Sequence, residues 1–191
     1  MDNFLKLFNP TELTETIKKL AKKQLSDKIW IANGFELSSS RYDDLKYMIL
    51  DEEKCRKYKN SFLIFAQATH SGSSYAFYKK PDAENCDEWP VIVMGDEGGC
   101  VVLAENIFGL MRFLTLNYVQ PYINSLDYQD FNLFLDDEID YDSEPSNEEY
   151  KKWIKKDFGL EVVLTIEQAK EEIITPAINK YQSILNPIFE I

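Results

Sequence analysis

Residues 61–116 decide the fold, and they read SFLIFAQATHSGSSYAFYKKPDAENCDEWPVIVMGDEGGCVVLAENIFGLMRFLTL. Four runs in this stretch are apolar or alternate with period two, which is typical of strands: 62–68, 75–80, 91–94 and 100–104. The run 62–68 is apolar on both faces, which predicts a central strand covered on both sides, and 75–80 alternates as a half-exposed strand does. Gly and Ser separate the runs where the chain has to reverse. From Asn106 to Leu114 the apolar residues recur with a period of about 3.6, as in an amphipathic helix. The stretch therefore predicts an antiparallel meander closed by a helix.

The totals fit one domain built around that meander. The chain has 191 residues, and its 45% hydrophobic content is enough to fill one core. We expect an α+β domain over 1–191, with an antiparallel sheet of about four to six strands packed with N-terminal and C-terminal helices. Its parts are the core at 61–116, an acidic loop at 136–149 and C-terminal helices at 147–185.

The cellular setting follows from what the chain lacks. Its apolar runs are far shorter than the roughly 20 residues of a membrane span, and its N-terminus has no export signal. Cys55, Cys86 and Cys100 form an odd set without CxxC spacing, which argues against a disulfide framework and against a zinc site. A reducing cytoplasm is the simplest location.

Before the core, the sequence predicts two helices and a short strand. Asn9 as cap and Glu12 three residues later indicate a helix start. A second helix is expected to begin at Arg41 and to fade in the charged residues that follow. The IWIA run predicts a short strand at 28–32, in which Trp30 is expected to serve packing.

After the core, the sequence predicts three helical regions. A short helix is expected at 126–135. The Ser146–Glu149 pair is a capping box for a helix that ends at Gly159, where a left-handed residue is favoured. The Thr165–Gln168 pair repeats the box for a final helix, which Pro176 should kink or break because proline lacks the backbone donor.

The charge of the chain excludes some partners and favours others. Its net charge is −12 and its pI is near 4.6, so it repels phosphate backbones and anionic lipids. We expect no nucleic-acid or membrane partner and a preference for a basic protein. Eight acids and no base lie within 136–149: Asp136, Asp137, Glu138, Asp140, Asp142, Glu144, Glu148 and Glu149. Such blocks are usually solvated loops.

The candidate catalytic and ligand motifs are weak. His70, the one histidine, sits among serines at a turn, without a GxSxG elbow or a cysteine nucleophile motif. Gly95–Gly99 lacks the spacing of a phosphate loop, and its acids would repel phosphate, so a turn is the better interpretation.

A calcium loop is also disfavoured. Glu138, Asp140, Asp142 and Glu149 have the offsets of its ligands, but Ser143 replaces the required glycine and Pro145 follows. We predict no cofactor and no metal.

Three segments resemble the SUKH superfamily, which includes the yeast Smi/Knr cell-wall regulator and many bacterial immunity proteins. FLIFAQATHSGSSYAFY is similar to that family's strand, small polar turn and aromatic strand. WPVIVMGDEGGCVVLAENIFGLMRFLTL resembles its block of two strands, a glycine-rich tip and a hydrophobic helix. YKKWIKKDFGL resembles the helix that follows in one subset. The resemblance covers 61–116 and 150–160.

The resemblance implies an α+β domain that acts by binding and not by catalysis. In bacteria, such proteins protect the producing cell by occluding a toxin, often a nuclease with a basic cleft, and acidic charge suits that role. The alternative is a regulatory or scaffolding module without a toxin partner. The predicted partner-binding residues are the acids of the loop and of the glycine-rich tip: Asp136, Asp137, Glu138, Asp140, Asp142, Asp96 and Glu97.

Overall fold

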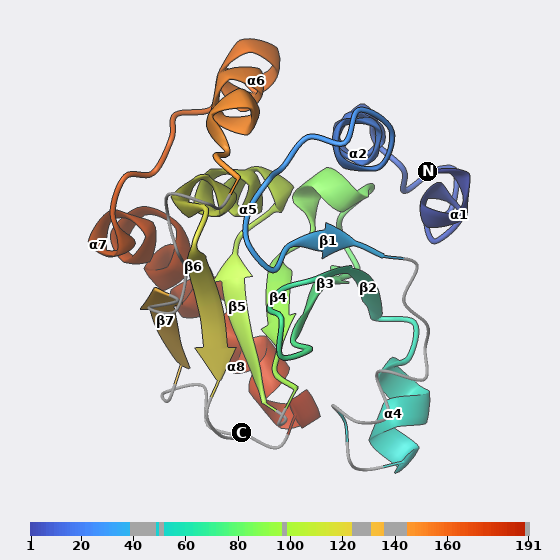
Figure 1. Ribbon diagram of the computed structural model, residues 1–191. Coiled ribbons are helices and arrows are strands. Elements are labelled where there is room, and N and C mark those ends of the chain that lie inside the picture. The colour runs from blue at the N-terminus through green and yellow to red at the C-terminus, as the bar shows by residue number, and fades with distance from the viewer. Residues whose placement is uncertain (39–48, 50–51, 97–98, 124–130, 136–144, 190–191) are drawn as a thin grey trace.

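A five-stranded antiparallel sheet forms the centre of the computed structural model, which describes residues 1–38, 49, 52–96, 99–123, 131–135 and 145–189. Its strands lie in chain order: β1 (Glu36–Leu37), β2 (Phe62–Gln67), β3 (Ser74–Tyr78), β4 (Val91–Met94) and β5 (Cys100–Ala104). A second, two-stranded antiparallel sheet pairs β6 (Val119–Ile123) with β7 (Phe131–Leu135). The predicted α+β class and the antiparallel meander are confirmed (Figure 1).

Both faces of the five-stranded sheet are buried. Successive side chains of a strand point to opposite faces, and in β2 Phe62 and Ile64 join one apolar cluster while Leu63 and Phe65 join another. The covered central strand predicted at 62–68 is confirmed. The half-exposed strand predicted at 75–80 is wrong in its burial, because Tyr75, Ala76 and Phe77 are all buried.

Helices cover the two faces of the sheet (Figure 1). The cluster that holds Phe62 also contains residues of α4 (Glu52–Tyr58) and α8 (Thr175–Phe189). The other cluster contains residues of α1 (Asp2–Leu5), α2 (Glu15–Ala21), α5 (Ile107–Phe113), α6 (Glu148–Phe158) and α7 (Ile166–Ala169). Short 3-10 turns lie at Cys86–Glu88 and Leu114–Leu116, and wider π-helical turns lie at Lys22–Ser26 and Lys170–Ile174.

Several predicted element boundaries before the core are corrected. The first long helix begins at Glu15 and not near Asn9, because the Thr14 hydroxyl accepts the Ile17 amide and supplies the cap. The predicted contact at Asn9 exists as a turn, where its amide donates to the Glu12 carboxylate at 3.2 Å. The predicted start at Arg41 lies outside the described residues, and α4 occupies the stretch where that helix was expected to fade.

Two predicted elements have the wrong type. The segment 28–32 forms no strand, because no other strand pairs with it. The described part of the predicted helix at 126–135 is the strand β7, whose residues Phe131 and Leu133 pack against the core while Asn132 and Phe134 are exposed. Pairing with β6 therefore outweighs the helix propensity of this run.

The C-terminal helices are confirmed with changed details. Gly159 ends α6 in the left-handed conformation, at φ 66°. The cap of α6 is Asn147, without a side-chain bond to the helix, and not the predicted Ser146 box. Thr165 accepts the Gln168 amide at 3.1 Å, as predicted. A break at Pro176 is wrong, because a π-helical turn precedes it and leaves proline in the first turn of α8, where a missing donor costs little.

Two glutamine side chains close the edges of the five-stranded sheet. At the β5 edge, Gln182 is 3% exposed, accepts the Val102 amide at 2.9 Å and donates to the Cys100 carbonyl at 3.1 Å. At the β1 edge, Gln24 donates to the Phe35 carbonyl at 2.9 Å and accepts the Leu37 amide at 2.6 Å. Each amide therefore takes the place of a peptide group of a neighbouring strand.

Replacing Gln182 with methionine should destabilise the protein strongly. Two buried backbone groups of β5 would lose their partner, at about 1–3 kcal/mol each, so we expect about 2–6 kcal/mol of lost unfolding free energy in urea titrations. Hydrogen exchange at the Val102 amide should also accelerate. Gln168→Met is the matched control, because Gln168 makes its bonds at the exposed start of α7. Equal losses for both variants would contradict this role of Gln182.

Replacing Glu12 with glutamine should cost stability only above acidic pH. Burial favours the neutral carboxyl, but hydrogen bonds from Lys79 and Asn9 outweigh it and hold the pKa of Glu12 below its ordinary value of 4.5. A depressed folded-state pKa gives stability that is present at higher pH and lost as the pH falls through it. We expect a loss of about 1 kcal/mol at neutral pH. Urea titrations should show this difference vanishing as the pH falls below 4.5, and a difference independent of pH would exclude the ionic contribution.

Candidate functional site

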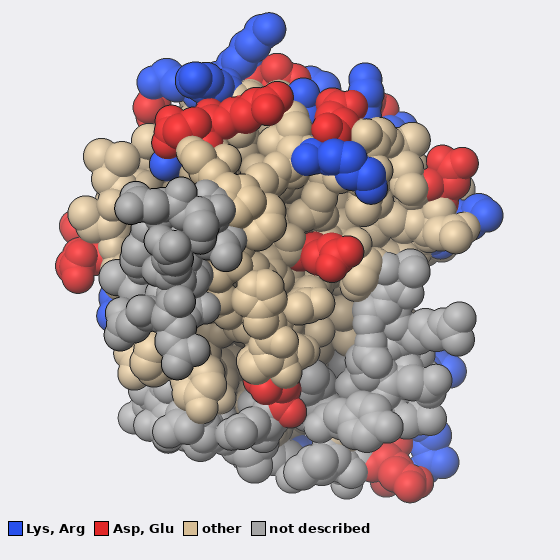
Figure 2. All heavy atoms as spheres, in the orientation of Figure 1, with Lys and Arg blue, Asp and Glu red and all other residues tan. Residues whose placement is uncertain are grey.

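An open groove of 530 Å³ lies beside β1. The chain from Lys28 to Glu36 forms most of its lining, and the other lining residues are Gln24, Leu25, Gln67, His70 and Pro145. In Figure 1, this part of the chain is the blue segment that leads from α2 to β1. In Figure 2, charged side chains gather near α2 and α6. Of the residues that line the groove, Lys28 and Glu36 carry a charge.

Asn117 fixes the wall of the groove. Its φ is 54°, a left-handed conformation that asparagine tolerates better than most residues. Its carbonyl accepts the Asn33 amide at 2.7 Å, and its side-chain oxygen accepts the Trp30 indole N–H at 2.8 Å. Its side-chain amide donates to the Pro145 carbonyl at 3.2 Å. Asn117 therefore joins the segment 30–33 to Pro145, and both line the groove or lie beside it.

Asn147 supports the same wall from inside. It is 1% exposed, and its side-chain amide donates to the carbonyls of Ile31 and Leu114 at 3.0 Å each. A buried amide with its bonds made restricts the backbone to one arrangement. The sequence pattern did not identify Asn117 or Asn147, because their partners lie far away in the chain and no local motif marks them.

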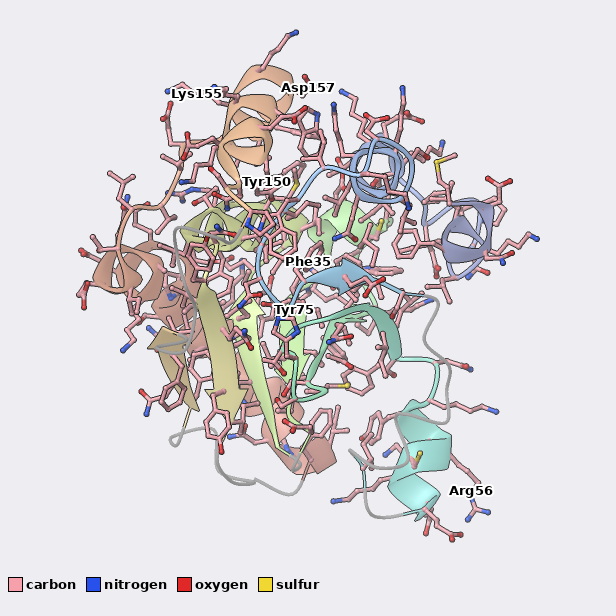
Figure 3. All side chains as sticks on the ribbon, in the orientation of Figure 1. Phe35, Arg56, Tyr75, Tyr150, Lys155 and Asp157 are labelled. Atoms are coloured by element: carbon pink, nitrogen blue, oxygen red, sulfur yellow. The ribbon has the colours of Figure 1, made fainter. Side chains whose placement is uncertain are left out.

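The floor of the groove rests on the core. Gly34 has φ 74°, and a Cβ there would lie 3.0 Å from the Thr69 Cα, so the turn after β2 packs directly on its backbone. The rings of Phe35 and Tyr75 lie 6.0 Å apart beneath β1 (Figure 3). His70 contacts the Asn33 side-chain oxygen through Nε2 at 2.8 Å. The groove is thus a preformed hollow with a packed base.

The predicted acidic residues divide into two groups. Asp96 is exposed at the tip after β4, where its carboxylate accepts the Ser73 hydroxyl at 2.7 Å and holds the turn that contains His70. Glu97 and the loop acids Asp136, Asp137, Glu138, Asp140 and Asp142 lie outside the described residues. Asp96 therefore bonds to the same 69–73 turn that supplies His70 to the lining of the groove.

Both ends of the acidic run 136–144 are anchored next to the groove. Before the run, Leu135 pairs with Val119 across the β6–β7 ladder. After the run, the Pro145 carbonyl accepts bonds from Asn117 and from the Tyr118 hydroxyl. Leu135 and Pro145, the residues that flank this run of six acids and no base, therefore both contact the stretch 117–119.

Other candidate chemistry finds little support in the described residues. Within them, the only side-chain partner of the His70 ring is Asn33. Burial raises the pKa of the Cys100 thiol, and it also raises that of Cys86 despite opposing bonds from Thr14, so neither is poised as a thiolate. Gly95 and Gly99 close a turn through a backbone bond of 3.2 Å. Among the described residues, no group of three His, Cys, Asp or Glu side chains could hold a metal ion.

A second hollow, of 370 Å³, is a weaker candidate. It surrounds Arg112, whose guanidinium already pairs with Glu172 and donates to the Glu161 carbonyl. The positive charge of Arg112 is therefore already paired with a carboxylate of the same chain. Trp30, predicted to serve packing, is half-buried, donates its indole N–H to Asn117 and lines the first groove.

Comparisons with known proteins do not name a relative. Across the described residues, none of the helices has the length and apolar character needed to cross a membrane. Searches against models of protein families, curated proteins and solved structures found no match.

Proposed function

We propose that the chain is a non-catalytic binding protein of the immunity type, which neutralises a basic toxin domain by occluding it. The SUKH-like segments at 61–116 and 150–160 motivate this proposal, and the α+β meander is the fold that the resemblance implies. A binding protein acts through its surface, so the chain should present a surface suited to a protein partner.

The observation that carries the proposal is the groove beside β1 with the acidic run anchored at its wall. Trp30 offers a large ring there, and tryptophan is among the residues enriched where proteins bind each other. The groove is lined mainly by uncharged groups, and the residues that flank the acidic run, Leu135 and Pro145, contact Val119 and Asn117. A neutral centre with charge at its border is the usual anatomy of a protein interface.

The charge determines which partner fits. With a net charge of −12, the protein attracts a basic surface and repels nucleic acid. Acids at the border of an interface mainly speed encounter, and they contribute less to the lifetime of the complex. A nuclease toxin with a basic cleft fits this description. Its cleft would be covered by an acidic protein in the position of the substrate.

The proposed location is the reducing cytoplasm of the producing cell. Cys55, Cys86 and Cys100 are buried, and no disulfide joins them. Such a protein could act where the toxin is made, before export. This part of the proposal rests on the family resemblance and on the reduced cysteines together.

Co-expression tests the function directly. Cells that produce the toxin candidate encoded next to this gene should survive only when this protein is present, and the two chains should co-purify in a 1:1 complex of the kind tight inhibitors form. Cell death despite co-expression, with no complex formed, would contradict immunity. Recovery of several housekeeping proteins instead would favour the scaffolding alternative.

Neutralising the acidic run should slow association with that toxin. We expect Asp136, Asp137, Glu138, Asp140 and Asp142, changed together to Asn or Gln, to lower the association rate about tenfold at low salt while dissociation changes little. The matched control changes five exposed acids elsewhere: Glu52, Glu53, Glu84, Glu88 and Glu167. Surface plasmon resonance at two salt concentrations measures the association and dissociation rates of both variants. Equal association rates for both would show that only net charge matters.

A further inference from the structure

The strand β7 has one open edge. It pairs with β6 on one side, and among the described residues no strand pairs with its other side. Figure 1 shows β7 beside β6, on the side away from β5. Within the described part of the chain, the backbone of residues 131–135 hydrogen-bonds to β6 alone. The outer edge of β7 therefore presents backbone donors and acceptors that another strand can use.

The edges of the five-stranded sheet are closed, whereas this edge is not. Gln24 closes the edge of β1, and Gln182 closes the edge of β5. Proteins also protect an edge strand with charged side chains or with proline. The strand β7 reads FNLFL, which contains neither a charge nor a proline. It therefore lacks the features that keep other strands from pairing with an edge.

The side chains of β7 suit an interface on both faces of the strand. Phe134 is 51% exposed, and its ring lies edge-on to Tyr122 of β6, with the ring centroids 5.2 Å apart. Asn132 is exposed on the same face. On the other face, Phe131 and Leu133 pack against the core but stay half-buried. Covering this strand would therefore remove further apolar surface from water.

We infer that β7 pairs with β7 of a second copy of this chain, antiparallel, and forms a symmetric dimer with a continuous four-stranded sheet. A two-fold axis at Leu133 places Leu133 opposite itself, and it places Asn132 opposite Phe134 of the second copy. The half-buried face of one strand then continues into the same face of the other, because opposed residues share a face. The strand carries no charge that would select a charged partner, and a second copy supplies the matching pattern.

Charge gives this contact a distinctive dependence on salt. Each copy has a net charge of −12, so two copies repel each other at low salt. The charges lie outside the strand, and added salt shortens the range of their repulsion, to about 8 Å at physiological ionic strength. The dimer should therefore become tighter as salt is added. Binding of a basic toxin would have the opposite dependence.

Size-exclusion chromatography with light scattering tests the dimer. The wild-type protein should pass reversibly from monomer to dimer between about 1 and 100 µM, the range of a weak interface, and at lower concentration in about 0.5 M than in about 0.05 M NaCl. A monomer at about 100 µM in the higher salt would overturn the inference. The measurement uses this chain alone, so its result is independent of the toxin co-expression test.

Paired charge substitutions test the register. Asn132→Lys with Phe134→Lys places like charges opposite each other in the dimer, and Asn132→Glu with Phe134→Glu does the same with the other sign. Each variant alone should dimerise at least tenfold more weakly, and a mixture of the two should form a 1:1 heterodimer. Both positions are exposed, so the fold should persist, as circular dichroism can verify.

Leu164→Lys with Ile184→Lys is the matched control, because it adds the same charge at two exposed apolar residues outside β7. This control should dimerise like the wild type. A dimer that persists in both the lysine and the glutamate variants of β7, or a mixture of them that stays monomeric, would place the contact elsewhere and overturn the inference.

Discussion

The structure depends on a sheet that is buried on both faces and therefore has to be closed at both edges. Apolar side chains on alternate residues of β2, β4 and β5 fill two separate clusters, so water reaches neither face. Backbone groups at an edge beneath helices cannot then rely on water, and an unpaired buried group is costly. Gln24 and Gln182 solve this problem in the same way at opposite edges, each accepting one amide and donating to one carbonyl.

The need to pair buried backbone groups also explains the asparagines around the groove. The chain from Asp27 to Phe35 belongs to no helix or strand, so its backbone groups need partners from elsewhere. Asn117 and Asn147 provide them, with side chains that reach Trp30, Ile31 and Pro145. The groove is therefore held open by buried polar bonds, and its shape exists before any partner arrives. A preformed surface avoids part of the ordering cost of binding.

The central meander was predictable because its signals are local. Residues 62–104 alternate or stay apolar between glycine turns, and Asn106 caps the next helix, where its side chain accepts the Gly109 amide. Errors arose where a distant partner decided the outcome. The run that ends at Leu135 is a strand because β6 pairs with it, and Asn147 turns away from its helix to bond Ile31. Propensity is a weak guide at such positions, since tertiary contacts override it.

The groove was not predictable as a site, yet the strand prediction at 28–32 carried information about it. Local sequence and fold usually agree, and natural chains depart from that agreement mainly at functional or strained positions. Here the pattern of IWIA favours a strand, but no other described strand pairs with it. Asn117 and Asn147 hold the segment instead, through bonds to the Asn33 amide, the Trp30 indole and the Ile31 carbonyl, so its conformation is decided by residues far away in the sequence.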